Sequence, residues 1–199
     1  MGVANNYKSS ALWKKYLSKQ ENDEHDSSRD RLRVAYDRFF ENSKILSQQI
    51  QKDLPNLTLH DENHYNALWR QASKIWNVNI ELTPLEVFIL GCAILVHDLA
   101  NSTYAFEKGI DSIKETAQWK DNEVFYKKKY NKEILDKDDE KDILLNVLRH
   151  IHANQAEKIC EFKCKNDNNE FRIFEDDDLR TDLGELIGKI GASHHWNID

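Results

Sequence analysis

The histidines of this sequence gather in short clusters whose residue types suit metal binding. Seven of the eight histidines follow residue 59, within the stretches LHDENHYNAL, LVHDLA, LRHIHANQA and GASHHW. Imidazole and carboxylate groups are ligands for divalent transition metals, and a buried histidine costs free energy unless it is hydrogen-bonded or ligated. Helical bundles build metal sites when several helices project such groups toward one interior point. The four stretches together therefore predict a metal centre.

The first two clusters contain three candidate ligands. His64 follows His60 by four residues, so the two share one face of a helix. His64 is the better candidate, because His60-Asp61 is typical of a helix N-cap. His97 and Asp98 are adjacent, so on a regular helix they point about a quarter-turn apart. Both reach one centre if the helix ends there, and Asp98 is then able to bridge two ions.

The last two clusters each pose a choice between neighbouring histidines. His150 and His152 are two residues apart, so we expect only one of them to enter a common site. The apolar positions of this helix favour His152. His194 and His195 are adjacent, and both remain candidate ligands. Taken singly, any of these histidines is more often a surface or hydrogen-bonded residue than a ligand, so the prediction depends on their joint arrangement.

The elements that would position these groups are nearly all helices. The chain has only two prolines and six glycines. Helical spacing of apolar residues predicts helices over 10–20, 27–54, 61–76, 84–97, 138–162 and 178–196. Thr83-Pro84-Leu85-Glu86 is the strongest local signal, because it combines an N-cap, a first-position proline and a capping box. Residues 110–135 are expected to be a partly helical insertion, and 77–82 and 171–174 are short strand candidates.

Composition and charge limit the class of protein. The chain has 199 residues, of which 40% are hydrophobic and 32% charged, as in a soluble globular domain. The longest apolar run, 87–96, is far shorter than the ~20 residues of a membrane span. No signal-peptide core begins the chain, so we expect a cytoplasmic protein without a membrane partner. The net charge of −7 argues against a groove for duplex nucleic acid, but a metal would still attract a small phosphate-bearing substrate.

The cysteines favour a reducing compartment. Cys92, Cys160 and Cys164 form no even disulfide framework. The stretch CEFKC is expected on a helix, with its two thiols four residues apart. No second pair of cysteines is present to complete a tetrahedral zinc site.

These residues resemble the HD superfamily of metal-dependent phosphohydrolases. In that family a helix histidine is followed by an HD pair at the end of an apolar helix and by later histidines. The stretches TLHDENHYNALW, LTPLEVFILGCAILVHDLA and IGASHHWNID are similar to HD domains that occur beside or fused to GHKL-type ATPase modules, several in predicted bacterial antiphage systems. The resemblance implies an all-α HD-domain bundle over 55–199, and 1–54 is expected to be an N-terminal helical extension.

The resemblance also implies a ligand set and a reaction. His64 and His97 would hold one divalent ion, and Asp98 would bridge or orient. The second ion would be held by His152, His194 and His195. Such ions lower the pKa of bound water from 15.7 to roughly 7 and so supply hydroxide for hydrolysis of a nucleotide or nucleic-acid phosphate. In this reading His97 and Asp98 are the catalytic pair, and a small nucleotide is the favoured substrate. One or two ions of manganese, iron, nickel or zinc suit these ligands better than magnesium.

Two alternatives belong to other classes. The chain has Leu99, Ala100 and Asn101 where the family usually has a small residue and a lysine. The family's final aspartate has no convincing match, so we expect that this ligand is missing, lies beyond Asp199 or comes from a partner. A non-catalytic HD-fold module that binds or regulates a GHKL-type ATPase is therefore the second hypothesis. The third is a structural bundle, which predicts that the histidine clusters lie far apart.

Overall fold

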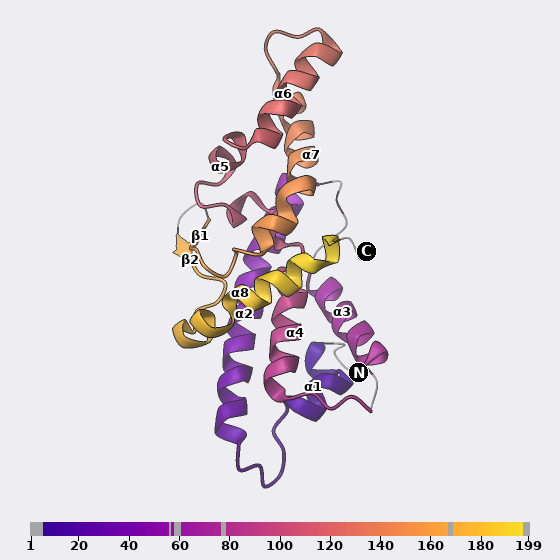
Figure 1. Ribbon diagram of the computed structural model, residues 1–199, viewed down its shortest axis with the longest axis vertical. Coiled ribbons are helices and arrows are strands. Elements are labelled where there is room, and N and C mark those ends of the chain that lie inside the picture. Colours follow the sequence, from indigo (N-terminus) through magenta and orange to yellow (C-terminus); the bar gives the residue numbers. More distant parts are fainter. Residues whose placement is uncertain (1–5, 56, 58–60, 77–78, 167–168, 197–199) are drawn as a thin grey trace.

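The computed structural model describes residues 6–55, 57, 61–76, 79–166 and 169–196, and this part of the chain is an all-α bundle, as the sequence predicts (Figure 1). Its helices are α1 (Ala11–Tyr16), α2 (Asp26–Asp53), α3 (Glu62–Ile75), α4 (Pro84–Val96), α5 (Ile110–Lys114), α6 (Ala117–Tyr130), α7 (Lys137–Ala156) and α8 (Asp177–Ala192). The described strands are β1 (Cys164–Lys165) and β2 (Glu170–Phe171), which pair antiparallel.

Helix α4 lies at the centre of the core. Its start is the predicted capping box, in which the Thr83 hydroxyl accepts a hydrogen bond from the Glu86 amide and the Glu86 carboxylate accepts one from the Thr83 amide. Pro84 occupies the first helical position, where it leaves no hydrogen bond unmade. Helices α2, α3 and α8 pack around α4. This surrounds α4 with apolar neighbours and explains why it is apolar on nearly every face.

The segment Pro84–Asn101 is also long and apolar enough, by composition, to cross a membrane. However, 61% of it is buried inside the structure. Phe88 and Leu95 of α4, for example, are completely inaccessible to solvent. This burial is typical of a core helix.

Aromatic side chains attach α3 to the N-terminal part of the chain. The Trp69 indole of α3 donates a hydrogen bond to the Tyr36 hydroxyl of α2, with 2.6 Å between nitrogen and oxygen. The Tyr7 amide donates to the Asn66 side-chain oxygen of α3 at 2.7 Å, and the Tyr7 ring packs against Trp13. These contacts place the buried residues between Tyr7 and Leu54 in one hydrophobic cluster with α3. They also hold the helix that carries His64.

Helix α8 crosses α4 and α2 on one face of the molecule (Figure 1). Its buried face contains glycines where neighbouring backbone and side chains come close. A Cβ atom on Gly188 would lie 2.2 Å from the carbonyl oxygen of Glu157, and one on Gly191 would lie 2.5 Å from a methyl carbon of Val96. The same Gly191 position is 3.6 Å from the amide nitrogen of His97. The glycines thus bring the end of α8 against the end of α4.

The predicted insertion is largely helical. Residues 110–135 contain α5 and α6, and α6 packs beside α7 to form an arm that projects from the body of the molecule (Figure 1). Of the two strand candidates, 171–174 contributes only Phe171 to β2. Residues 79–82 are turn and coil, and 77 and 78 lie outside the described residues.

The prediction that CEFKC lies on a helix is wrong. Helix α7 ends at Ala156, and the chain continues in tight turns in which Ile159 and Glu161 donate to carbonyls three residues earlier. Cys160 is in these turns and Cys164 is in β1, so the two thiols occupy different elements. The turns bury both cysteines, and we attribute the early helix end to this burial and to the contact of α8 with the chain just after α7.

The close approach of α8 makes a stability prediction. Gly188→Ala should lower the free energy of unfolding by about 1–3 kcal/mol, because its Cβ would meet a backbone carbonyl that is unable to move aside. Urea denaturation followed by circular dichroism measures the change. Thr181→Ala, on the exposed face of α8, is the control and should change little. Equal stability of Gly188→Ala and wild type would contradict this packing.

Candidate metal centre

The HD pair lies where α4 stops. The last α4 residue is Val96, His97 is the C-cap, and Asp98 precedes a 3-10 turn over Leu99–Asn101. Because the α-helix does not continue, the two side chains converge, and His97 Nε2 is 2.8 Å from Asp98 Oδ2. The helix thus ends where it must for the His97 and Asp98 side chains to reach one centre.

A first group of possible ligands joins α3 to the end of α4. The donor atoms of His64, His97 and Asp98 lie within 4.8 Å of one another. The His64 and His97 rings are stacked, with their centroids 5.5 Å apart. Asp61 caps α3 by accepting a hydrogen bond from the His64 amide, so the start of α3 is fixed at the residue that enters the group.

A second group joins α7 to the end of α8. His152 is buried on α7, whereas His194 and His195 are more exposed and lie in a 3-10 turn that follows α8. Their donor atoms also lie within 4.8 Å of one another. The His152 ring centroid is 4.6 Å from that of His195 and 5.5 Å from that of His194. Both histidines of the final pair therefore face the group, because the tight turn places adjacent rings side by side.

The Asp98 carboxylate lies between the two groups. Its Oδ2 contacts His97 of the first group, and its Oδ1 is 3.6 Å from His152 Nε2 and 3.7 Å from His194 Nε2 of the second. The histidine clusters that an unrelated structural bundle would hold apart thus converge on one carboxylate. A carboxylate with both oxygens so placed is able to bridge two ions.

The imidazoles are oriented so that Nε2 is the atom presented to the centre. In His97, His152 and His194, Nδ1 lies 2.6–3.2 Å from a carbonyl oxygen of the preceding helical turn. A carbonyl only accepts, so Nδ1 carries a proton and donates. In neutral His152 and His194, Nε2 then keeps its lone pair, whereas protonated His97 also donates from Nε2 to Asp98 Oδ2. Backbone carbonyls fix the tautomer of metal-binding histidines in this way.

Burial and the Asp98 charge set the protonation of these histidines in opposite directions. Burial lowers the pKa of His97, but the hydrogen bond to Asp98 and its negative charge outweigh this, so the pKa of His97 is raised above 6.5. Burial, reinforced by neighbouring imidazoles, lowers the pKa of His152 and of His194 below 6.5. These two are neutral near pH 7, the state in which imidazole binds a metal.

The residues fit one or two divalent ions. Donor atoms at about 2.1 Å from an ion are roughly 3–4 Å from one another, and both groups are within a small adjustment of that spacing. The donors are imidazole nitrogens and one carboxylate, a mixture that suits manganese, iron, nickel or zinc. The first group would use His64, His97 and Asp98, and the second the other three histidines.

One further described histidine of the same stretches, His150, does not join these groups. His150 is exposed on α7, and its Nδ1 lies 2.7 Å from the carbonyl oxygen of Asn146 in the same helix. It points away from His152, as expected for residues two apart. His60 lies outside the described residues, as does Asp199.

The loop after the HD pair contains supporting residues that the sequence analysis did not identify. The Asn101 side chain is buried and donates a hydrogen bond to the backbone carbonyl of Asp98 at 3.1 Å. Asp53, at the end of α2, accepts hydrogen bonds from the amide and hydroxyl of Thr103, both at 2.8 Å. For the Asn101 contact, the only local sequence signal is the spacing of three residues from Asp98. The Asp53–Thr103 contact joins residues 50 positions apart, so no local sequence pattern indicates it.

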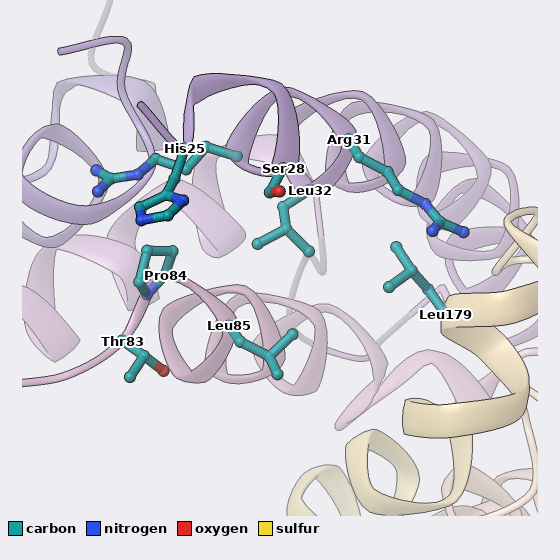
Figure 2. Close-up of a pocket in the computed structure, with 9 residues that line it drawn as sticks. His25, Ser28, Arg31, Leu32, Thr83, Pro84, Leu85 and Leu179 are labelled. Carbon is teal, nitrogen blue, oxygen red and sulfur yellow. The ribbon is translucent and has the colours of Figure 1, made fainter. Parts of the chain in front are cut away.

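An apolar pocket lies away from these histidines, at the other end of α4 (Figure 2). It has a volume of about 480 Å³ and lies between the first turns of α2 and α4, lined in part by Leu32, Leu85 and Leu179. Eleven residues of α4 lie between Leu85 of its lining and His97, which places the two roughly 18 Å apart along the helix axis. Its lining also includes Arg29 and Arg31, but Arg29 pairs with Asp23 and Arg31 pairs with Asp176 and Asp178, so we place the chemistry at the histidines.

Comparison with known proteins bears on the same region. A family model described as HD-CE matches residues 54–199, nearly three quarters of the chain. No curated protein matches the chain, and no solved structure matches it. The matched region contains both groups of possible ligands.

The opposite pKa shifts are testable in metal-free protein. In a histidine NMR titration, His97 should titrate above pH 6.5, and His152 and His194 below it. Asp98→Asn should lower the pKa of His97, because it removes the charge that raises it. A His97 pKa that is unchanged in this variant would show that Asp98 does not govern it.

The same shifts set the direction of the pH dependence of stability. The stabilising contribution of His97 is fully present below pH 6.5 and is lost as the pH rises through its folded-state pKa. The contributions of His152 and His194 are present above pH 6.5 and are lost as the pH falls through their lower folded-state pKa values. Urea unfolding of His97→Ala and His152→Ala at several pH values should therefore give opposite slopes relative to wild type.

Proposed function

The chain belongs to the HD-CE family, and from this premise we propose that it is a metal-dependent phosphohydrolase. HD domains generally bind divalent metals, and this one has two candidate groups of ligands. The observation that carries the proposal is the Asp98 carboxylate, which lies between His97 on one side and His152 and His194 on the other. No other arrangement in the described part of the chain brings so many metal ligands to one point.

In this proposal each group of ligands holds one ion. His64, His97 and Asp98 would hold one ion, and His152, His194 and His195 a second. When bound, divalent ions polarise a phosphoryl oxygen and lower the pKa of water toward neutrality. The Asp98 carboxylate would link the two groups. The backbone carbonyls that bind Nδ1 hold the imidazole rings with Nε2 facing inward.

We further propose a small nucleotide as the substrate. The chain has a net charge of −7, which argues against a broad positive groove for duplex nucleic acid. The ions themselves would provide local positive charge for a phosphate. His194 and His195 are the exposed members of the site and so mark its accessible side. A GHKL-type ATPase partner, an antiphage role and a cytoplasmic location stay predictions from the sequence.

Metal binding has a matched pair of test variants on one helix. His152→Ala should lose at least half of the bound manganese or iron, because His152 is a ligand in this proposal. His150→Ala, two residues away and exposed, should keep it. Elemental analysis after reconstitution and gel filtration measures the ions per chain. Equal metal content in both variants would remove His152 from the site.

Catalysis is tested with Asp98→Asn, which preserves shape and removes charge. We expect at least about a 100-fold loss of manganese-dependent turnover, since even residues that only orient metal ligands cost 10–100-fold. The candidate substrates are mono-, di-, tri- and cyclic nucleotides and short single-stranded oligonucleotides. Chromatography after incubation with the protein measures and identifies the product. Asp142→Asn, an exposed position of α7, is the control and should retain activity.

Two outcomes distinguish the proposal from its rival. Turnover that is lost in the ligand variants and retained in the control variants, together with the bound metal, supports a hydrolase. A chain that binds metal at His152 and Asp98 but turns over none of the substrates would instead be a non-catalytic HD-fold module. A chain that binds no metal after reconstitution contradicts both the site and the activity.

A further inference from the structure

Helix α8 has two apolar faces, and the described part of the chain buries the first completely but covers the second only at its N-terminal half, where Leu179 and Leu183 pack against the core. The face against α4 and α7 contains the small and buried residues Gly184, Ile187, Gly188, Gly191 and Ala192. The second face, which we call the α8 stripe, consists of Leu179, Leu183, Leu186 and Ile190. Leu186 is 46% exposed and Ile190 39%, while Leu179 and Leu183 are half-buried. Figure 1 shows α8 on one face of the molecule, with no described element passing in front of it.

The spacing of the α8 stripe is that of a helix that pairs with another helix. Its residues are separated by four, three and four positions, the spacing of the a and d positions in a heptad. Such a seam lies along one side of a helix and accepts the side chains of a facing helix. Apolar side chains in a continuous row at the surface also mark interaction sites more often than scattered ones do.

The charges beside the α8 stripe point to what covers it. We propose that α8 pairs antiparallel with the α8 helix of a second copy of this chain. In the symmetric register, Leu183 faces Leu186 of the second copy and Leu179 faces its Ile190. Asp182 and Lys189 flank the stripe on the same side, and this register brings each Asp182 close to the Lys189 of the other copy.

This charge pattern selects the antiparallel orientation. Asp182 is exposed and has no ion-pair partner among the described residues, and Lys189 bonds only to Glu185 of its own helix there. A parallel two-fold pair would place the two copies of this flank on opposite sides of the seam, so that no Asp182–Lys189 contact would form between the helices. The antiparallel pair instead makes two equivalent Asp182–Lys189 contacts, as two-fold symmetry requires.

The ends of α8 are complementary in the same orientation. Exposed carboxylates of Asp177 and Asp178 begin the helix, and the imidazoles of His194 and His195 follow its end. Antiparallel pairing places the positive end of each helix dipole beside the negative end of the other. The inference concerns the surface of α8 and does not depend on the proposed hydrolysis.

Sedimentation velocity of the full chain at roughly 1–100 µM tests the pairing. Wild type should sediment at twice the chain mass at the upper concentrations. Leu186→Asp should sediment as a monomer, because a buried carboxylate would face an apolar side chain. Ile134→Asp is the matched control, since Ile134 is 84% exposed at the arm beyond α6, and it should remain dimeric. Circular dichroism checks that each variant is folded.

Charge exchange tests the orientation. Asp182→Lys and Lys189→Asp should each weaken the dimer by several-fold, because each creates two like-charge contacts across the two-fold axis. The double variant Asp182→Lys/Lys189→Asp restores opposite charges and should recover the wild-type dissociation constant. A wild-type chain that is monomeric at 100 µM, with the α8 stripe left for some other protein, overturns the proposal. So does a dimer that Leu186→Asp does not affect, or a double variant without rescue.

Discussion

The contact between the Asp98 carboxylate and the surrounding imidazoles is the constraint on which the rest of this structure depends. Three imidazoles reach one carboxylate only if the ends of α4, α7 and α8 meet. An ionised carboxylate is expensive to remove from water unless it is paired, so the helices that converge here must also supply compensating groups. Protonated His97 does so, and a bound divalent ion would do so more strongly.

The helix ends are held by interactions far from the histidines. Trp69 and Tyr36 fix α3 against α2, and the glycines of α8 permit its close approach to α4 and to the chain after α7. Neither set of residues is able to bind a metal. Their contribution is positional, because a shift of about 1 Å at a helix end moves an imidazole out of ligand range. Packing and chemistry are therefore linked through the rigidity of the helices rather than through direct contacts.

The Nδ1 protons of His97 and His194 are fixed by the same helix ends. The last carbonyls of a helix lack an amide partner within the helix, so they are free to accept another hydrogen bond. His97 and His194 use such carbonyls to bind Nδ1, which turns Nε2 toward Asp98. A helix that ends at a metal ligand thus releases adjacent side chains from their regular helical directions. It also fixes the orientation of the imidazole ring. The proposed pairing of α8 would add a second surface that depends on the position of this helix.

Local sequence was enough to predict the helices, the capping box at Thr83 and the helix end at His97, because each rests on hydrogen bonds between residues a few positions apart. It also identified the residue types that converge. Which elements meet was decided by tertiary packing. The early end of α7, the separation of Cys160 from Cys164 and the Asp53–Thr103 contact all depend on residues distant in the chain. Such close approaches are set by the shapes of two surfaces at once, and one stretch of sequence describes only one of them.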